Sequence, residues 1–503
     1  MSEDFATIVD AFIYAVKNTG DAKALIFEDK ELTYHQYGKN ATGIAAELAS
    51  IGVKKGDRVA ISAATSADVP QLIFGILTAG GQVVMINPLY TAREVEPLLD
   101  ISEPKYIFCD SSAIEVGAAL AAGKNIGLID ISQGLDSWLD TPENKLPIEF
   151  PADLPKAEDP ALILFTGGTT GISKGVPHTH AEIIAAMEIS DQTWPFEPES
   201  EIVLNVPPLF HIVGHYHGVY QTVYRRVAVM FLPRFHPDEV FEAFKNHPIT
   251  VFIIGVATAY SALMKHPEFD KVDFSGVKYC AGGGAPLAVK TREEWESRTG
   301  VPALEGYGMT EGAPYCSNSF RKPGKDLSAG RILDGVELQI VDVETGNTEL
   351  PTGESGEIRV RGPHVTKGYL NDKEATETAF RESWLYTGDI AYKDQDGFIF
   401  IVDRSKDMAL VSGFNVFPRE IDEVLIAHPK ILEAAVVGIP DDYRGEIIKA
   451  YVVVRDGETL DEAGILDYCG DNLVKYKVPT VVEFLDALPK TPVGKIDKKQ
   501  LKS

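Results

Sequence analysis

The sequence feature that most limits the possible folds is residues 162–175, LILFTGGTTGISKG. The segment begins as a short apolar run, which is typical of a buried strand, and continues as a loop rich in Gly and Thr. Glycines allow a backbone to approach a ligand closely and to turn its N–H groups toward one point. Thr166, Thr169 and Thr170 add hydroxyl donors, and Lys174 adds a positive charge. Such an array suits a polyphosphate.

Two other interpretations of this segment fit its residues less well. Gly/Thr-rich turns between a strand and a helix are common, but nearly every residue from Thr166 to Lys174 is small, donor-bearing or cationic, which favours phosphate binding. A Walker A loop requires G-x-x-x-x-G-K-[ST], whereas here Ser173 precedes Lys174 and Gly175 follows it. The loop therefore need not end at a helix N-terminus.

Length and composition restrict the classes of protein further. A chain of 503 residues is too long for one core, and its formal net charge of −27 disfavours nonspecific binding to nucleic acid or anionic membranes. Any anionic substrate must then be met by a local basic or amide-lined site. The four cysteines show no C-x-x-C spacing, which predicts a reduced cytoplasmic protein without a zinc cluster. No signal peptide is expected, because the acidic N-terminus MSEDFATIVD lacks a hydrophobic region. No membrane span is expected, because Pro and Gly interrupt the long apolar stretch 69–90.

Alternating strand and helix patterns predict an α/β fold. Strands are expected at 58–64, 82–87 and 105–110, and again at 228–232, 250–255, 277–286 and 303–311, with helices between most of them. Gly-rich loops follow three of the strands, and ligands in such sheets bind beyond the carboxyl ends of strands. We therefore expect the three loops to converge on one pocket. Short β-branched runs then indicate a small antiparallel β-unit, and from about Ser405 a final unit has the order helix, strand, strand, helix, strand.

Seven motifs occur together in a specific order. They are TGGTTGISKG, PPLFHIVG, GGGAP, EGYGMTE, YTGD, IVDRSKDMALVSGFNVFP and KTPVGKI. In the residues, order and spacing of these motifs, the chain resembles the superfamily of acyl-CoA synthetases, adenylation domains and luciferases. It is most similar to the bacterial and archaeal fatty-acid–CoA ligases. The resemblance extends from about Gly52 to the C-terminus.

The resemblance implies a fold and a reaction. A large N-terminal domain, residues 1–404, would contain two α/β sheets and a small β-barrel-like unit, and residues 405–503 would form a small mobile α+β domain. The implied reaction has two steps: a carboxylate attacks the α-phosphorus of ATP and releases pyrophosphate, and coenzyme A then attacks the acyl-adenylate and releases AMP. ATP, Mg²⁺ and coenzyme A are the implied cofactor and co-substrates.

Site roles follow residue by residue from the same resemblance. Tyr307 would offer an aromatic face to adenine, and Thr310 would offer a hydroxyl to the α-phosphate. Glu311 would offer a carboxylate to Mg²⁺, and Asp389 and Arg404 would contact the ribose. The full set implied for ATP is Thr166, Gly167, Gly168, Thr169, Thr170, Gly171, Lys174, Gly283, Gly284, Ala285, Glu305, Gly306, Tyr307, Gly308, Met309, Asp389, Ile401 and Arg404. Ser173 departs from the family pattern, in which many relatives have Pro.

The last domain carries a catalytic lysine and a hinge in this family. Lys495 would meet the carboxylate and the α-phosphate during adenylation, although a lysine near a C-terminus is usually a solvated surface charge. Lys406 occupies the hinge, and the loop with Gly413 would serve the thiol step after the domain swings.

The acyl pocket is defined by fewer residues. His211 matches a position that orients the carboxylate, with a hydrogen-bonded interior histidine as the alternative. Gly308 stands where acetate-activating relatives have a bulky aromatic, which leaves depth for a longer acid. His215 and His217 match no zinc spacing and are expected to be structural or pocket-lining.

The leading functional prediction is a cytoplasmic ATP-dependent acyl-CoA synthetase for medium- or long-chain fatty acids. An aryl or branched-acid ligase, an enzyme loading a separate carrier protein, and a nucleotide-binding regulator or phosphotransferase are the alternatives. The expected partners are the small-molecule acid, ATP and coenzyme A, without nucleic acid and without a transmembrane segment. Weak peripheral membrane contact is compatible with the expectation, as is a monomer or a homodimer.

Overall fold

One α/β sheet is built from strands between residues 58 and 179. The computed structural model describes residues 4–139, 148–166, 173–285, 287–322, 324–343, 345–404, 407–411, 414–441, 444–491 and 494–502. The sheet has the order β6-β5-β3-β4-β7-β8 and is parallel except for β8, which pairs antiparallel with β7. Its strands are β3 (Arg58–Ser62), β4 (Gln82–Met85), β5 (Tyr106–Cys109), β6 (Gly127–Asp130), β7 (Pro160–Phe165) and β8 (Gly175–Thr179).

A nine-stranded sheet lies beside it, in the order β15-β14-β13-β12-β11-β9-β10-β1-β2. The central strands are parallel, whereas β2, β14 and β15 pair antiparallel at the two ends. Its strands are β1 (Lys23–Phe27), β2 (Lys30–Thr33), β9 (Ile202–Asn205), β10 (Ala228–Phe231), β11 (Val251–Gly255), β12 (Tyr279–Gly283), β13 (Ala303–Met309), β14 (Gly312–Ser317) and β15 (Arg331–Ile332).

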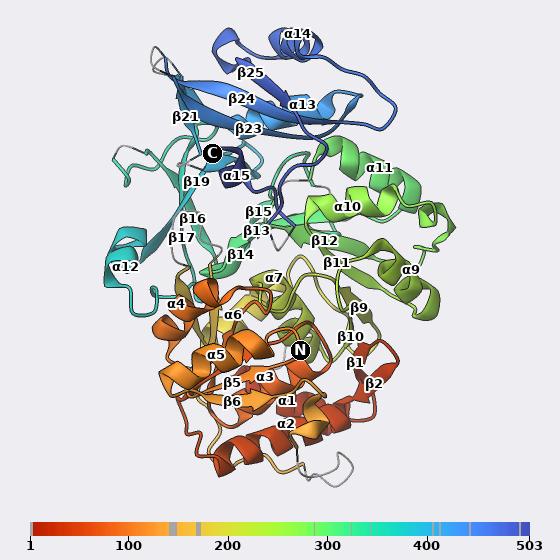
Figure 1. Ribbon diagram of the computed structural model, residues 1–503, viewed down its shortest axis with the longest axis vertical. Coiled ribbons are helices and arrows are strands. Elements are labelled where there is room, and N and C mark those ends of the chain that lie inside the picture. Colours follow the sequence, from red (N-terminus) through yellow and green to blue (C-terminus); the bar gives the residue numbers. More distant parts are fainter. Residues whose placement is uncertain are drawn as a thin grey trace.

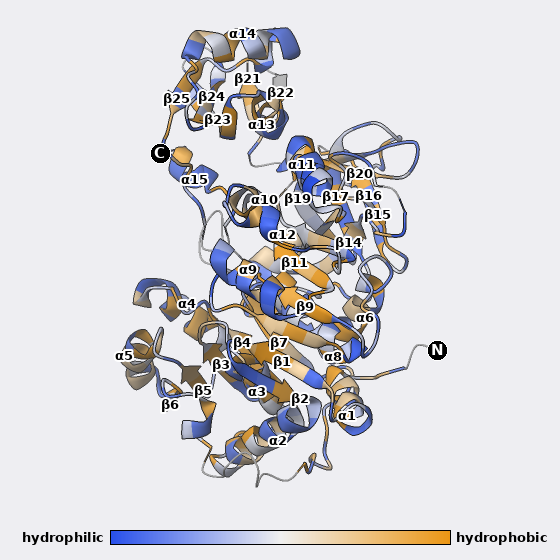
Figure 2. Ribbon diagram, turned by 90° about the vertical axis from the view of Figure 1, so that its right-hand side faces the viewer, coloured by the Kyte–Doolittle hydropathy of each residue, from blue (hydrophilic) through white to orange (hydrophobic). Residues whose placement is uncertain are grey.

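Helices cover both sheets and bury their apolar faces. The largest hydrophobic cluster joins residues from both sheets through α1 (Ile8–Asn18), α2 (Tyr34–Ser50), α3 (Asp68–Thr78) and α6 (His180–Ser190). A second cluster joins the other face of the larger sheet to α9 (Pro237–Asn246), α10 (Ala257–Met264) and α11 (Val289–Thr299), and a third joins the smaller sheet to α4 (Ala92–Ser102) and α5 (Ile114–Lys124). Figure 2 shows hydrophobic colouring on the central strands, whereas α11 is coloured mostly as hydrophilic.

A small antiparallel sheet follows the two large ones. It has the order β16-β17-β19-β18, with β20 also pairing with β19. Its elements are β16 (Glu337–Val341), β17 (Gly356–Arg361), α12 (Lys373–Ala379), β18 (Phe380–Arg381), β19 (Trp384–Lys393) and β20 (Ile399–Arg404). This sheet is the small β-unit that the sequence predicts.

The C-terminal part has its own sheet and core. The predicted order of helix, strand, strand, helix and strand is confirmed, with two additional short strands. Its elements are β21 (Ala409–Val411), β22 (Phe414–Val416), α13 (Pro418–Ala427), β23 (Ile431–Asp441), β24 (Gly445–Val454), α14 (Glu462–Asn472), β25 (Val481–Phe484) and α15 (Lys498–Leu501). Figure 1 shows this part at one end of the molecule, with the last residues before α15 running back toward β12, β13 and β15.

Two local features differ from the expectations. Residues 303–311 do not run from a strand into a loop, because β13 turns directly into β14 and forms an antiparallel hairpin. The Gly/Thr-rich loop likewise joins two antiparallel strands, so the strand β8 was missed. Thr179 then starts α6 through a capping box in which its hydroxyl oxygen accepts from the Glu182 N–H, 3.2 Å away. Within the described ranges, no helix has the length and apolar character needed to cross a membrane.

Candidate functional site

The two ends of the Gly/Thr-rich loop are held together by hydrogen bonds. The Thr166 N–H donates to the Lys174 carbonyl at 3.0 Å, and the Lys174 N–H donates to Thr166 Oγ1 at 3.2 Å. Thr166 directly follows β7 and Lys174 directly precedes β8, and these two strands are antiparallel neighbours. The intervening site residues Gly167, Gly168, Thr169, Thr170 and Gly171 lie outside the described part of the chain.

A buried carboxylate lies beside this loop. Glu311 is 4% exposed, and its Oε1 accepts a hydrogen bond of 2.6 Å from the Tyr369 hydroxyl. The Lys174 ammonium lies 4.6 Å from the centre of the Tyr369 ring. Burial raises the pKa of Glu311, while the Tyr369 donor and the Lys174 charge oppose that rise. Tyr369 was missed, because a tyrosine outside the seven motifs carries no distinguishing pattern.

The Glu311 carboxylate can be tested as a ligand for Mg²⁺. Mg²⁺ is commonly bound by one or two protein carboxylates together with substrate phosphates and water, so one buried oxygen donor beside a cationic loop suits it. No cluster of three or more His, Cys, Asp or Glu side chains within the described residues could hold a metal ion alone. The donor set therefore fits a metal that arrives with ATP better than one bound by the protein alone.

A second group joins three strands. The Tyr307 hydroxyl donates to Asp389 Oδ2 at 2.6 Å, and Arg404 Nε lies 3.0 Å from Asp389 Oδ1. Tyr307 is on β13, Asp389 on β19 and Arg404 at the end of β20, directly opposite Asp389 in the ladder. Asp389 is 4% exposed, so its charge is compensated within the protein. Burial, reinforced by Asp389, raises the pKa of Tyr307 well above its usual value.

Two glycines on β12 and β13, Gly283 and Gly306, stand where there is no room for a side chain. A Cβ on Gly283 would lie 2.4 Å from the Gly306 carbonyl oxygen, and one on Gly306 would lie 3.0 Å from the Trp194 ring. Gly284 adopts φ +77°, and a Cβ there would lie 2.8 Å from Lys495 Nζ. Glycine at this position therefore leaves the space into which the Lys495 ammonium reaches.

Lys495 reaches this place on a tight turn. The Thr491 N–H donates to the Lys495 carbonyl at 2.7 Å, and the Lys495 N–H donates to Thr491 Oγ1 at 3.2 Å. The turn is attached to the large N-terminal part because the Thr258 hydroxyl donates to the Gly494 carbonyl at 3.1 Å. Burial and the neighbouring Arg404 charge lower the pKa of Lys495 to about 8. Lys495 is thus not a solvated surface charge in this arrangement.

His211 stands at the start of α7 (Ile212–His215), and its Nδ1 accepts from the Val213 N–H at 3.4 Å. Burial and the nearby Lys495 charge lower the pKa of His211 to about 3. The imidazole is therefore neutral, and since Nδ1 accepts, the ring proton resides on Nε2. His211 can donate one hydrogen bond from Nε2 without adding a second positive charge beside Lys495.

His215 and His217 are buried and hydrogen-bonded. His215 Nδ1 donates to the Leu209 carbonyl at 2.9 Å, and His217 Nδ1 donates to Gln221 Oε1 at 2.6 Å. His217 lies in a π-helical turn (Tyr216–Tyr220), which is followed by α8 (Gln221–Arg225). The Gln221 amide donates to the Trp194 carbonyl at 2.8 Å, and the Trp194 and His217 ring centres are 5.1 Å apart. His217 is thereby linked to Trp194, the ring that meets Gly306.

The remaining predicted residues fall on the same strands. The Leu287 N–H donates to Glu305 Oε1 at 2.7 Å, and burial raises the pKa of Glu305 to about 7. Met309 and Ile401 pack into the core of the small sheet, and Ala285 follows Gly284. A Cβ on Gly308 would lie 2.7 Å from the Ala313 Cβ, so a large side chain there would have to displace the β13–β14 hairpin. Lys406 and Gly413 lie outside the described residues.

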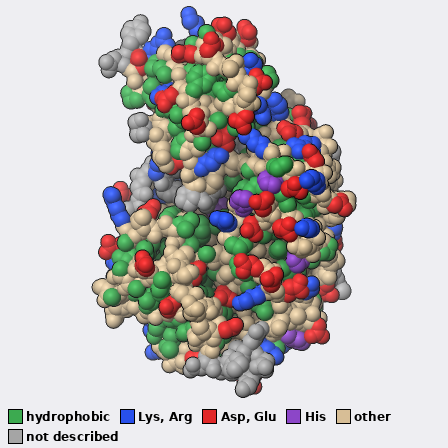
Figure 3. Space-filling view, turned by 45° about the vertical axis from the view of Figure 1, so that its right-hand side comes forward, with side chains coloured by type: hydrophobic (Ala, Val, Ile, Leu, Met, Phe, Trp, Pro, Cys, Tyr) green, Lys and Arg blue, Asp and Glu red, His purple; other side chains and the backbone are tan. Residues whose placement is uncertain are grey.

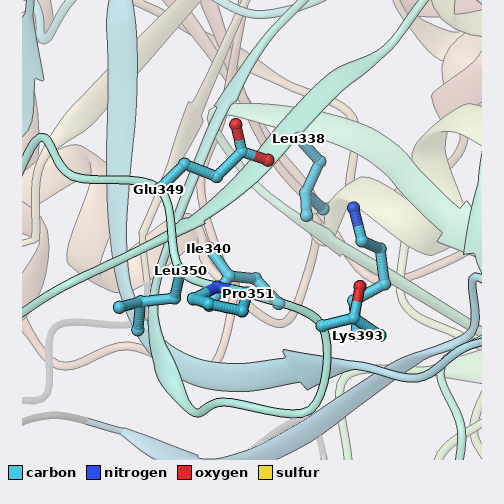
Figure 4. Close-up of a pocket in the computed structure, with 7 residues that line it drawn as sticks. Leu338, Ile340, Glu349, Leu350, Pro351 and Lys393 are labelled. Atoms are coloured by element: carbon cyan, nitrogen blue, oxygen red, sulfur yellow. The ribbon is translucent and has the colours of Figure 1, made fainter.

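In the view of Figure 3, acidic and basic side chains are interspersed over the large part of the molecule and form no single charged patch. A separate shallow pocket, drawn in Figure 4, is lined by Leu338, Ile340, Glu349, Leu350, Pro351, Thr352 and Lys393. It contains none of the predicted site residues.

Comparisons with known proteins identify the family of the chain. Residues 12–370 match the family model of the AMP-binding enzyme, and residues 420–495 match that of the AMP-binding enzyme C-terminal domain. The long-chain-fatty-acid–CoA ligase of Bacillus subtilis (strain 168) is 35% identical, over 96% of this chain and 91% of the relative.

Two solved structures have the same fold. ATP-bound MatB from Rhodopseudomonas palustris superimposes with a TM-score of 0.91 at 32% identity, over 98% of each chain. The o-succinylbenzoate CoA synthetase of Bacillus subtilis, in complex with its acyl-adenylate intermediate, superimposes with a TM-score of 0.85 at 28% identity, again over 98% of each chain.

The chain therefore belongs to the AMP-binding enzyme family. It is an AMP-forming acid–thiol ligase, which uses ATP and coenzyme A to convert a small-molecule carboxylic acid into its acyl-CoA.

Proposed function

We propose that the protein is a fatty-acid–CoA ligase for medium- or long-chain acids and that its chemistry is carried by the predicted site residues. The similarity to a long-chain-fatty-acid–CoA ligase over nearly the whole chain supports this substrate class. The observation that carries the proposal is the position of Lys495, whose ammonium reaches Gly284 and lies in the field of Asp389, Arg404 and His211.

In the first step a carboxylate oxygen attacks the α-phosphorus, and the bond to pyrophosphate breaks. Two anions must meet, so fixed positive charge and rigid donors lower the barrier. Lys495 supplies the charge between carboxylate and α-phosphate, and the neutral His211 orients the carboxylate through Nε2–H. Thr310 contributes its hydroxyl to the α-phosphate.

The leaving pyrophosphate is stabilised on the opposite side. The loop from Thr166 to Lys174 holds the β- and γ-phosphates with amides, hydroxyls and one ammonium. Glu311 would hold Mg²⁺, which on binding neutralises phosphate charge. Tyr307 and Asp389 hold the adenosine, with Arg404 balancing the Asp389 carboxylate.

In the second step the sulfur of coenzyme A attacks the acyl carbonyl, and AMP leaves. We propose that residues 405–503 form a domain that rotates about Lys406, withdraws Lys495 and brings the Gly413 loop to the site. The present arrangement, with Lys495 inserted, corresponds to the adenylating state. A cytoplasmic location and a monomer or homodimer remain part of the proposal.

A panel of acids tests both the reaction and the substrate class. Carboxylate-dependent exchange of labelled pyrophosphate into ATP is expected, and a protein without exchange would be a regulator or phosphotransferase instead. AMP release with free coenzyme A should be fastest with saturated acids of medium or long chain. Preference for benzoate-type acids would replace the fatty-acid proposal with an aryl ligase, and dependence on a carrier protein would indicate a loading enzyme.

A further inference from the structure

One buried histidine of β8 contacts the dipeptide Thr310–Glu311. His178 Nε2 lies 2.9 Å from the Thr310 carbonyl oxygen, and since a carbonyl only accepts, the imidazole donates. His178 is 1% exposed, and burial lowers its pKa to about 4, so the ring is neutral. Its Nδ1 is buried without a hydrogen-bond partner among the residues that the structure describes. A buried donor of this kind fixes its acceptor firmly, because breaking the bond would leave both groups unsatisfied.

Thr366 makes a second connection between the same two segments. Its hydroxyl donates to the Pro177 carbonyl at 2.6 Å, and its N–H donates to the Glu311 carbonyl at 2.8 Å. Adjacent residues of β8 therefore hold both carbonyls of the Thr310–Glu311 dipeptide, one directly and one through Thr366. These two contacts fix the main chain on both sides of the Glu311 Cα and directly after the Thr310 Cα, and so restrict where both side chains start.

These contacts between β8 and the Thr310–Glu311 dipeptide, which we call the β8 junction, lie next to the proposed pyrophosphate loop. The strand begins at Gly175, one residue after Lys174, and so continues directly from the proposed pyrophosphate loop. His178 is three residues further along. The junction thus sets the spacing between the loop that holds the leaving group and the groups at the α-phosphate.

Two other buried histidines show what a purely structural contact looks like. His364 Nε2 donates to the Pro314 carbonyl at 2.9 Å, and His215 Nδ1 donates to the Leu209 carbonyl at 2.9 Å. Both are as buried as His178, and burial likewise lowers the pKa of each to about 4. Their acceptors are not proposed phosphate or metal contacts. The three histidines are therefore alike in burial and in neutral charge. His178 differs only in the carbonyl to which it donates, which belongs to Thr310.

We propose that His178 is a positioning residue for adenylation, holding Thr310 and Glu311 at a fixed distance from the loop that binds the leaving pyrophosphate. This inference rests on the proposed roles of Thr310, Glu311 and the loop. His178 acts through the main chain and does not contact ATP.

The test compares three variants of the full-length protein in the two half-reactions. The His178→Gln side chain retains an N–H donor near the Nε2 position. The shorter His178→Asn side chain keeps a donor that does not reach the Thr310 carbonyl, and His178→Leu has no donor. Misplacing a reacting group by about 1 Å lowers the rate up to about 100-fold. Removing a residue that only positions such a group typically lowers activity about 10- to 100-fold. We therefore expect kcat for adenylation to fall about tenfold in the Leu and Asn variants. The Gln variant should recover most of the rate. The KM for the acid and thioester formation from supplied acyl-AMP should change less than about twofold.

His364→Leu is the matched control, since it removes an equally buried donor from a different carbonyl. It should lower the unfolding midpoint as much as His178→Leu but leave the ratio of the two half-reactions unchanged. Equal adenylation rates in the Gln, Asn and Leu variants, or equal losses for His178→Leu and His364→Leu, would overturn the positioning role. Absence of pyrophosphate exchange in the unaltered protein would instead overturn the proposed function, so the two failures are distinguishable.

Discussion

The two regions that meet at the site are attached in different ways. On the nucleotide side, Asp389 is held by Tyr307 from the nine-stranded sheet and by Arg404, which lies opposite Asp389 in the ladder of β19 and β20. On the lysine side, the described contacts at the turn are a single hydroxyl from Thr258 to Gly494 and the close approach of Lys495 to Gly284. The first region is joined by strand pairing as well as by side chains, whereas the second rests on local contacts. A two-step enzyme needs this combination if one step uses Lys495 and the other does not.

The largest test of this difference is Lys495→Ala. Loss of an ammonium that stabilises developing charge should lower adenylation about 10³-fold. Thioester formation from supplied acyl-AMP should stay within about twofold, because the proposed second state does not present this lysine. Rapid-quench measurement of each half-reaction separates the two.

Lys490→Ala provides the control on the same segment, since the Lys490 ammonium pairs with Glu433 at 2.7 Å and not with the site. It should leave both half-reactions unchanged. Equal loss of both steps in the Lys495→Ala variant would contradict the proposed movement.

Gly284→Ala should have the next largest effect. A methyl group 2.8 Å from Lys495 Nζ would displace the ammonium, and displacement of a catalytic group by about 1 Å costs up to about 100-fold. Adenylation should therefore fall by about 30- to 100-fold, with the thioester step largely spared. Gly300→Ala is the matched control, because Gly300 has φ +71° and open space around its Cβ position. A similar loss in both variants would show backbone strain instead of displacement of Lys495.

The pH dependence should also divide the two steps. Lys495 has a pKa of about 8, lowered by burial, and only its protonated form carries the needed charge. The kcat/KM for ATP in adenylation should hence be constant below about pH 8 and fall about tenfold per unit above it. The thioester step from supplied acyl-AMP should not follow this titration.

Lys495→Arg sharpens the pH test, since a guanidinium stays protonated throughout this range. Whatever its absolute rate, this variant should lose the decrease above pH 8. A decrease that persists in the Arg variant would assign the titration to another group.

Thr258→Val should have the smallest effect. It removes the hydroxyl that donates to the Gly494 carbonyl, and one hydrogen bond contributes about 1 kcal/mol, or about fivefold. Adenylation should fall by about three- to fivefold without a change in the unfolding midpoint of the N-terminal part. Thr299→Val, which removes a hydroxyl bond to the Trp295 carbonyl at 2.7 Å, should not alter adenylation. A thioester step that slows as much as adenylation would contradict a contact specific to the lysine-inserted state.

Some site features could be predicted because one short segment carries them. The Gly/Thr-rich loop and the EGYGMTE motif are local in sequence, and their residue types restrict both backbone and chemistry. Asp389 was found through its motif, although a Thr-Gly-Asp run by itself suggests a turn. Only the structure shows it inside a ten-residue strand, opposite Arg404.

Other features carry no such local pattern. Tyr369, Trp194 and His178 come from separate segments, and nothing in their neighbours distinguishes them from core residues. Their partners are Glu311, Gly306 and Thr310, at separations of 58, 112 and 132 residues. Interactions over such distances depend on how sheets pack, which periodicity does not specify.

The sequence by itself determined the alternation of strands and helices, the family, and most of the residues proposed for ATP. The reason is that the spacing of apolar residues and the residues of each motif lie within short segments of the chain. The tertiary structure alone decided that β7 and β8 form a hairpin and that Tyr307 donates to Asp389. It also decided that Lys495 reaches Gly284 with a lowered pKa. The physical reason is that burial and charge proximity arise only when separate sheets and the C-terminal turn pack together.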